Sequence, residues 1–222
     1  MNDASSGTGV ITAAMICNWF EKSAEVIANN RAHLTELDAP IGDSDHGNNM
    51  DRGYKAILEK LPRGEDGGGD IGAIFKLVAM TLISKVGGAS GPLYGTLFLE
   101  GGKPLSGKSE LTAEELARFF DDAIAGVIKR GRAEVGMKTM LDALVPSGEA
   151  FKAALSKGND ITSALAAAAN GAREGMEATI PMLAQRGRAS YLGERSIGHQ
   201  DPGATSWYLI LQALADTVAE AS

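Results

Sequence analysis

Apolar residues recur at helical intervals through most of the chain, and this periodicity limits the fold more than any other feature. The first run places Ile11, Met15, Trp19, Val26 and Leu34 along one stripe of a helix. No segment shows the alternation of apolar and polar residues that predicts a half-buried strand. The 34 Ala, against 6 Phe, 4 Tyr and 2 Trp, also favour packed helices over sheets. We therefore predict an all-α fold.

Caps and helix breakers divide the periodic runs into eight expected helices. Pro40 and Gly42 end the first helix, and Thr112 with Glu115 forms a capping box at the start of a later one. We expect residues 1–9 to form a disordered tail, residues 64–69 a flexible connector and residues 10–222 a single domain. The expected helices cover residues 10–38, 48–61, 71–86, a segment with Pro92 in its first turn, 112–130, 138–156, 161–183 and 204–219.

The overall charge and the absence of sorting signals narrow the classes of function. A formal net charge of −7 argues against a general nucleic-acid binder and against a membrane-surface protein. The single cysteine, Cys17, excludes an intrachain disulfide framework. No apolar run reaches the roughly 18 residues that a membrane span needs, and the N-terminus lacks the pattern of a secretory signal. We expect a cytoplasmic protein.

Three carboxylates crowd the loop that follows the first expected helix. Asp43 and Asp45 are two residues apart, so they point the same way in an extended segment. Asp38 lies at a helix C-terminus, where the helix dipole disfavours a carboxylate. A cation would offset this repulsion, and oxygen ligands suit Mg²⁺ or Ca²⁺.

The spacing of these acids does not fit an EF-hand. Counted from Asp43, the twelfth position is Tyr54, where a carboxylate is required. A Mg²⁺ site that shares its metal with a phosphate fits better, because a helix that starts just after His46 and Gly47 would direct N–H groups at that phosphate. An Asp- and Gly-rich turn with a helix cap is the alternative that the spacing leaves open.

Residues 102–109 match the P-loop pattern G-x-x-x-x-G-K-S, with Lys108 and Ser109 in the phosphate and metal positions. The pattern requires a preceding strand, a following helix and a surrounding parallel sheet. The rest of the chain lacks alternating strand and helix signals, and Pro104 with its flanking glycines suits an exposed loop. We therefore predict that this segment is not a P-loop.

Two further polar loops are candidates for contact with an anion. Residues 86–95 are small enough for close backbone approach, and Ser90 can donate a hydrogen bond at a helix start. Residues 187–203 carry Arg188 and Arg195, whose planar guanidinium groups suit phosphate. Tight helix packing for the first loop and a solvated loop for the second are the alternatives.

Taken together, the three loops resemble a known family. Residues 37–47 (LDAPIGDSDHG), 86–96 (VGGASGPLYGT) and 187–204 (GRASYLGERSIGHQDPGA) are similar to the nucleotide-binding L subunit of bacterial, phosphoenolpyruvate-dependent dihydroxyacetone kinases. The resemblance extends from about residue 11 to residue 219, and the last motif is long and specific.

This resemblance implies a barrel of eight antiparallel helices with a nucleotide held by the loops at one end. It implies that Asp38, Asp43 and Asp45 bind two Mg²⁺ ions that bridge to the phosphates of ADP or ATP, and that Arg188 is catalytic. The residues that would contact the nucleotide are His46, Gly47, Asn48, Asn49, Ala89, Ser90, Gly131, Met140, Arg188, Asp201, Pro202 and Gly203.

The resemblance also implies a reaction. ADP would stay bound, a phosphohistidine on an M subunit would convert it to ATP, and the γ-phosphoryl group would pass to dihydroxyacetone on a K subunit. The chain offers no Ser/His/Asp or Cys/His arrangement, which agrees with a reaction that needs mainly positioning and charge neutralisation. A subunit that uses free ATP, for dihydroxyacetone or another short ketose, is the alternative. The phosphoryl donor, the sugar and the oligomeric state stay open.

Overall fold

A computed structural model describes residues 9–62 and 69–222. The predicted tail and the predicted connector therefore lie outside the described residues, except for Gly9 and Gly69. In the described part, helices predominate: α1 (Ala13–Asn29), α2 (Arg31–Asp38), α3 (His46–Leu58), α4 (Ile71–Lys85), α5 (Ser90–Gly102), α6 (Ala113–Gly131), α7 (Leu141–Ser156), α8 (Ile161–Ala178) and α9 (Pro202–Ala221), with 3-10 helices η1 (Lys103–Leu105) and η2 (Arg188–Ser196) and strands β1 (Ile11–Thr12) and β2 (Glu110–Leu111). The predicted all-α class is confirmed.

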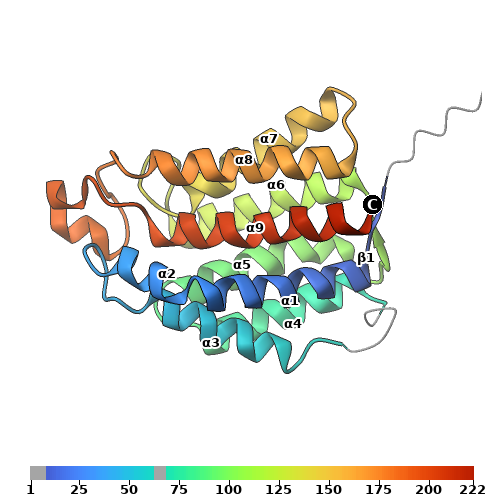
Figure 1. The fold of residues 1–222 in the computed structure, drawn as a ribbon, viewed down its shortest axis with the longest axis horizontal. Coiled ribbons are helices and arrows are strands. Elements are labelled where there is room, and N and C mark those ends of the chain that lie inside the picture. Colours follow the sequence, from blue (N-terminus) through green and yellow to red (C-terminus); the bar gives the residue numbers. More distant parts are fainter. Residues whose placement is uncertain (1–8, 63–68) are drawn as a thin grey trace, which may run out of the picture.

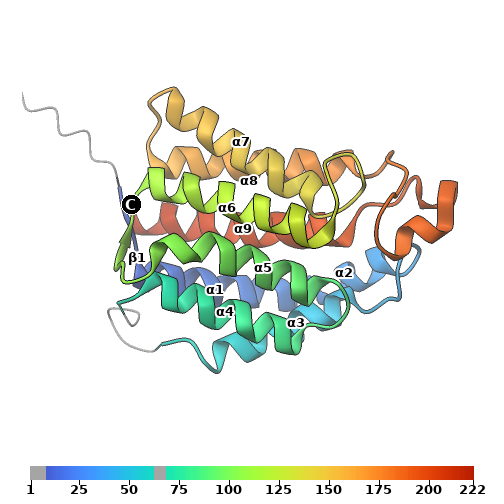
Figure 2. The same cartoon turned by 180° about the vertical axis from the view of Figure 1, so that it is seen from behind.

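The long helices lie side by side along the long axis of the molecule (Figures 1 and 2). From α3 to α9 each helix packs against the next, while α1 packs against both α3 and α9. These contacts form a closed circuit around one apolar core. The short helix α2 continues the direction of α1 and packs on α3 and α9.

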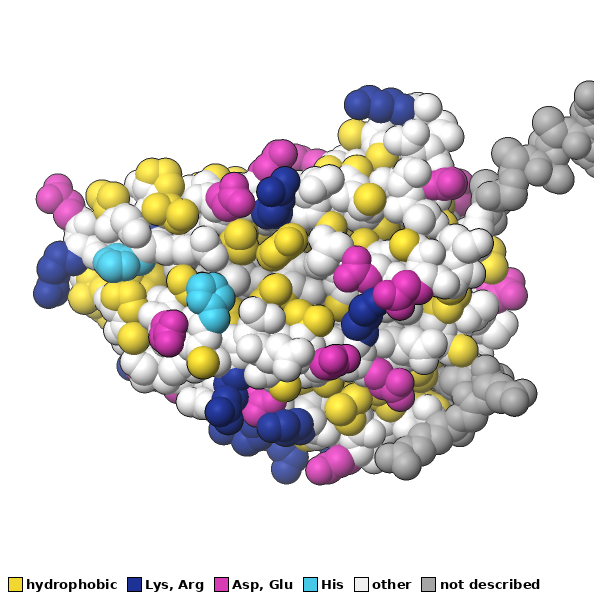
Figure 3. All heavy atoms as spheres, viewed as in Figure 1, with side chains coloured by type: hydrophobic (Ala, Val, Ile, Leu, Met, Phe, Trp, Pro, Cys, Tyr) yellow, Lys and Arg dark blue, Asp and Glu magenta, His cyan; other side chains and the backbone are white. Residues whose placement is uncertain are grey.

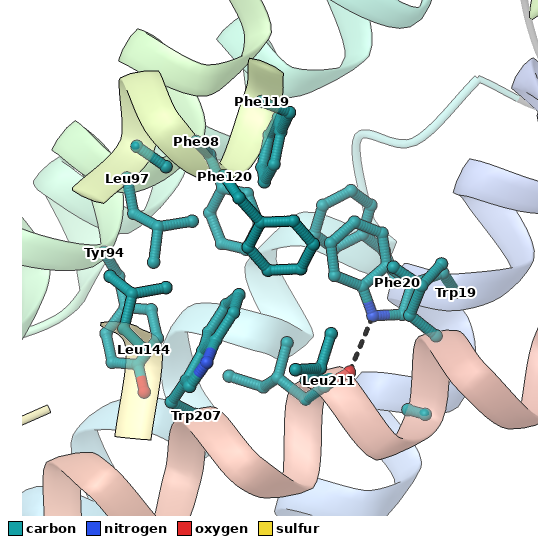
Figure 4. Close-up of a cluster of buried hydrophobic side chains, with 14 of the residues drawn as sticks. Trp19, Phe20, Tyr94, Leu97, Phe98, Phe119, Phe120, Leu144, Trp207 and Leu211 are labelled. Carbon is teal, nitrogen blue, oxygen red and sulfur yellow. Dashed lines mark hydrogen bonds between the residues drawn. The ribbon is translucent and has the colours of Figure 1, made fainter. Parts of the chain in front are cut away.

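Aromatic side chains fill the centre of this core (Figure 4). The Trp19 and Phe20 rings stack with centroids 4.7 Å apart, and Phe98 meets Phe20 edge to face at 5.2 Å. Both tryptophans are fully buried, and each indole N–H finds an acceptor: Trp19 donates to the Ile210 carbonyl at 2.8 Å and Trp207 to the Ser147 hydroxyl at 3.2 Å. A buried indole without such a partner would destabilise the core.

The expectation of one helix over residues 10–38 was wrong. The chain forms β1, α1 and α2, and the helix is interrupted at Asn30. The Asn30 backbone leaves the helical conformation at φ −98° and ψ 8°, and its side-chain amide donates to the Val26 carbonyl at 2.8 Å beside the ordinary helical bond from its backbone N–H. The apolar stripe continues from Ile27 to Leu34 across the break, so the periodicity alone did not reveal it.

A two-residue ladder also departs from the expected strand-free chain. Ile11 pairs with Leu111 and Thr12 with Glu110 in an antiparallel arrangement, at the end of the bundle away from α2 (Figure 1). Strands of two residues are too short for alternation to appear in the sequence. The ladder joins the start of α1 to the segment before α6.

Other boundaries shift by a few residues. The capping box at α6 is confirmed: the Thr112 hydroxyl accepts from the Glu115 N–H, and the Glu115 carboxylate accepts from the Thr112 N–H. The segment 187–203, expected to be irregular, contains η2, and α7 begins three residues later than predicted. Among the described residues no helix combines the length and apolarity of a membrane span.

Charges are interspersed over the face shown in Figure 3, although Lys and Arg side chains gather over α3. The net negative charge is therefore not spread uniformly. Arg52 and Lys55 are exposed there, and Lys55 pairs with Asp51 at 2.7 Å.

Candidate functional site

A cavity of about 680 Å³ opens at the end of the bundle that carries α2 and η2, on the left of Figure 1. Five separate stretches of the chain line it, and they include all three loops singled out in the sequence. The lining residues fall within 38–46, 87–94, 127–141, 185–191 and 201–203. The fold thus brings together segments up to 165 positions apart in the sequence.

The three acidic residues form one cluster on the wall of this cavity. An oxygen from each of Asp38, Asp43 and Asp45 lies within 4.8 Å of the other two. Within the part of the chain that the structure describes, this is the group of acidic, His or Cys side chains suited to hold a metal ion. Clustered carboxylate oxygens are the ligands that Mg²⁺ and Ca²⁺ prefer.

Asp38 both belongs to this cluster and shapes the loop. Its Oδ2 accepts from the backbone N–H groups of Asp45 at 2.9 Å and His46 at 3.2 Å. Its backbone carbonyl accepts from Gly42 at 2.6 Å, and a Cβ at Gly42 would lie 1.9 Å from the Asp38 Oδ1. Only glycine therefore lets the loop fold over the Asp38 carboxylate.

The balance of charge in the cluster favours a cation. Desolvation, together with the charges of Asp45 and Asp38, raises the pKa of Asp43, while Arg188 lowers it. The Arg188 guanidinium lies 2.8 Å from the Asp43 Oδ2, in an exposed ion pair. One guanidinium opposite three carboxylates leaves excess negative charge, which a divalent ion would offset.

The Gly-rich loop, residues 86–95, leads into the start of α5 on the wall of the same cavity. Ala89 and Ser90 line the cavity at the N-terminal end of this helix. A Cβ at Gly91 would lie 2.3 Å from the Val86 carbonyl, so the turn requires glycine at that position. A helix N-terminus that faces a cavity offers N–H groups and a positive dipole end to an anion.

His46 is buried behind the acidic loop between two hydroxyl groups. Its Nδ1 lies 3.1 Å from the Ser90 Oγ, and its Nε2 lies 2.9 Å from the Ser206 Oγ. Burial lowers the pKa of His46 to about 4, although Asp38 and Asp45 counteract this effect. The imidazole is therefore neutral near pH 7 and links α3, α5 and α9.

A second polar cluster, not foreseen from the sequence, supports the far wall of the cavity. The buried Lys138 ammonium donates to the carbonyls of Thr179 at 2.7 Å, Met182 at 3.2 Å and Ile180 at 3.3 Å, just beyond the end of α8. Burial lowers the pKa of Lys138, and the charges of Asp201 and Asp142 raise it.

The two acids of this cluster hold backbone groups. The Asp142 carboxylate accepts from Gly136 N at 2.5 Å and from Thr139 N at 2.7 Å. Asp201 caps α9 by accepting from Ala204 N at 2.7 Å, and burial raises the pKa of Asp201 to about 7. Lys138 and Asp142 belong to no motif, so only the tertiary structure reveals that they act together with Asp201.

Most of the predicted site residues line the cavity, and three do not. Those that line it are Asp38, Asp43, Asp45, His46, Ala89, Ser90, Gly131, Met140, Arg188, Asp201, Pro202 and Gly203. Gly47, Asn48 and Asn49 directly follow His46 in the first turn of α3. A Cβ at Gly47 would lie 2.0 Å from the Arg31 carbonyl, and the Asn49 side chain packs on Gly87 while accepting from Arg52. Their predicted contact with nucleotide stays a prediction.

The segment that matches the P-loop pattern lacks the required context. It begins at the last residue of α5 and contains η1, so the element that leads directly into it is a helix and not a strand. Lys108 pairs with Glu115 of the capping box at 2.5 Å, and the Lys108 carbonyl accepts from Ile71 N. The segment lies beside β2, at the opposite end of the bundle from the acidic cluster.

Replacement of Lys108 by alanine is expected to change nucleotide affinity by less than about twofold and stability by less than about 1 kcal/mol, because the residue contributes one exposed ion pair. Titration calorimetry with ADP and Mg²⁺ measures the affinity, and thermal unfolding measures the stability. A tenfold loss of affinity would restore the P-loop interpretation.

The fold and the cavity define a class of protein: an all-helical domain with a cavity and a cluster of three carboxylates in the loops at one end. Residues 40–216 match the DAK2 domain, and the chain therefore belongs to the DAK2 domain family. It is 47% identical over 205 residues to the ADP-binding subunit DhaL of the PEP-dependent dihydroxyacetone kinase of Escherichia coli (strain K12). That match covers 92% of this chain and 97% of the relative.

Two longer proteins also contain a similar region. The D-erythrulose kinase of Mycolicibacterium smegmatis is 33% identical over 97% of this chain. The crystal structure of the dihydroxyacetone kinase from C. freundii in complex with AMP-PNP and Mg²⁺ superposes with a TM-score of 0.68 and 25% identity over 97% of this chain. This chain spans 37% of the first protein and 36% of the second.

Proposed function

We propose that this chain is the ADP-binding subunit of a phosphoenolpyruvate-dependent dihydroxyacetone kinase. The observation that carries the proposal is the cluster of Asp38, Asp43 and Asp45, which faces a cavity walled by the Gly-rich loop and η2. Near-complete coverage of the E. coli DhaL subunit supports it further, because that protein is named as an ADP-binding subunit.

The donor set suits magnesium. Three carboxylates within 4.8 Å of one another would hold two Mg²⁺ ions, which when bound would neutralise phosphate charge. The complex of the C. freundii kinase contains AMP-PNP and Mg²⁺, which is consistent with such a donor set. Two ions opposite three carboxylates would leave net positive charge for the nucleotide.

The protein's own residues would supply positioning. The start of α5 with Ser90 would hold phosphate oxygens, and the wall of Gly131, Met140 and residues 201–203 would hold the nucleoside. Arg188 would swing from Asp43 to the transferring phosphoryl group, whose charge a guanidinium matches well. Neither step needs a nucleophile on this chain.

The proposed reaction requires two partner proteins. A phosphohistidine on an M subunit would phosphorylate bound ADP, and the γ-phosphoryl group would then pass to dihydroxyacetone on a K subunit. The circuit of helices supports an eight-helix barrel in which α2 extends α1, with residues 10–222 as one domain. We place the protein in the cytoplasm, with no nucleic-acid or membrane partner.

A subunit that uses free ATP is the second candidate, for dihydroxyacetone or another short ketose. The similarity to the D-erythrulose kinase favours this possibility, since that protein acts on a different short ketose. The identity to DhaL, 47%, is higher than the 33% identity to the erythrulose kinase, which favours the first candidate.

Retention of ADP separates these candidates. The protein purified in the presence of Mg²⁺ is expected to carry about one ADP through gel filtration, detected by mass spectrometry of the released nucleotide. Addition of EDTA is expected to release it, because the cluster would lose its cations. Fast exchange with free ATP and turnover without a carrier protein would favour the ATP-dependent alternative, and no binding of any adenine nucleotide would contradict both.

A further inference from the structure

A buried chain of hydrogen bonds runs from the cavity wall into α9. It begins at the Ser90 Oγ, passes through His46, and reaches the Ser206 Oγ on the other side of the imidazole ring. The Tyr94 hydroxyl lies 2.7 Å from the Ser206 Oγ, and both hydroxyl groups contact the Gly203 carbonyl, at 3.2 Å and 3.1 Å. Ser206 is fully buried and does not line the cavity.

The hydrogens in this hydrogen-bonded chain can be arranged in two ways, because each ring nitrogen of His46 faces one hydroxyl group. With the proton on Nδ1, the ring donates to Ser90 and accepts from Ser206, so the Ser90 hydrogen is free to point into the cavity. With the proton on Nε2, the ring donates to Ser206, whose hydrogen then goes to Gly203, and Ser90 must donate to Nδ1. Every buried group has a partner in both arrangements.

An anion in the cavity distinguishes the two arrangements, because Ser90 has one hydrogen to give. If Ser90 donates to a ligand oxygen, it cannot also donate to His46, and the ring must then carry its proton on Nδ1. Ser206 makes this arrangement possible by donating to the Nε2 lone pair, and Tyr94 supports Ser206.

We propose that Ser206 is a positioning residue, which acts through His46 to leave the Ser90 hydroxyl hydrogen available to a nucleotide phosphate. The inference rests on the proposed function, since it requires a phosphate within reach of Ser90. The inference adds Ser206 to the proposed site, although Ser206 does not touch the ligand and belongs to no motif in the sequence. The imidazole transmits the effect because its two nitrogens have opposite roles.

Nitrogen NMR of the histidine-labelled protein tests the arrangement directly. The chain contains three histidines, and the His46→Asn variant assigns the relevant signals. In the presence of Mg²⁺ and AMP-PNP, the His46 proton is expected on Nδ1 in the wild-type protein. In the Ser206→Ala variant the proton is expected to be distributed over Nδ1 and Nε2. Ser206→Thr keeps the hydroxyl and is expected to restore the proton to Nδ1.

Affinity provides the second measurement. Ser206→Ala is expected to weaken the binding of AMP-PNP about tenfold, the effect of one misdirected hydrogen bond to a charged group. Ser147→Ala is the matched control. That buried hydroxyl donates to the Leu144 carbonyl and accepts from the Trp207 indole, but it does not belong to the hydrogen-bonded chain through His46. The control is expected to lower thermal stability without a change in affinity or in the His46 signals.

Two results would overturn the inference. A wild-type complex with a proton on Nε2 and none on Nδ1 would show that Ser90 donates to His46 and not to the ligand. Equal affinities of the Ser206→Ala and wild-type proteins would show that Ser206 has only a structural role. In both cases the proposed function stands if AMP-PNP binds, whereas failure of the wild-type protein to bind any adenine nucleotide would overturn the proposed function itself.

Discussion

Replacement of Asp45 by asparagine is expected to lower the affinity for ADP in the presence of Mg²⁺ about a hundredfold or more, because it removes one of three charges from the proposed metal site. Asp45 is the suitable position, since its side chain makes no capping hydrogen bond to α3. The folded structure should therefore persist. Titration calorimetry with and without Mg²⁺ measures the effect, and the magnesium dependence itself should nearly vanish in the variant.

Asp38 would be a poorer choice for this experiment. Its carboxylate also accepts from Asp45 N and His46 N, so its loss would disturb the loop as well as the metal. The matched control is Asp122→Asn on the exposed surface of α6, which changes the net charge equally at a distance from the cavity. An Asp45→Asn variant with unchanged affinity would contradict the proposed metal site.

Replacement of Arg188 by alanine is expected to slow phosphoryl transfer about a hundredfold or more while ADP affinity changes far less, because the guanidinium would act on the charge of the transferring group. The assay uses the protein loaded with ADP, a phosphorylated carrier protein and a dihydroxyacetone-binding subunit. Rapid-quench measurement of a single turnover separates the transfer step from partner binding.

Two further variants test whether the slower transfer is specific to the Arg188 guanidinium. Arg188→Lys keeps the charge but loses the planar pair of donors, so it is expected to recover only part of the rate. Arg195→Ala removes a cation from the same segment η2, beyond the kink at Gly193, but Arg195 does not line the cavity, and the rate of this variant is expected to stay within about twofold of wild type. Equal losses in Arg188→Ala and Arg195→Ala would assign the effect to the overall charge of η2.

Local patterns in the sequence predicted the elements of the fold well where a single chemical signal decides the structure. The capping box at Thr112 and the apolar faces of the helices depend on residues three or four positions apart. The break at Asn30 was missed because the apolar stripe continues through it, and the two-residue ladder because it is too short to show a period.

In the candidate site too, only the residues that belong to local motifs were predicted. The acidic loop, the Gly-rich loop and Arg188 were visible as motifs, and the cavity brings these motifs together. Ser206, Lys138 and Asp142 were not visible, because their roles depend on partners supplied by distant segments. Such buried polar groups are recognised only once the fold shows which donors and acceptors face them.

The placement of the two tryptophans has a practical consequence. Both indoles are buried, and Trp207 directly follows Ser206, one turn beyond the residues of α9 that line the cavity. Trp19, in contrast, packs against the rings of Phe20, Phe75 and Phe98. Tryptophan fluorescence of the unlabelled protein can therefore follow ligand binding, because Trp207 lies one helical turn from the residues that line the cavity.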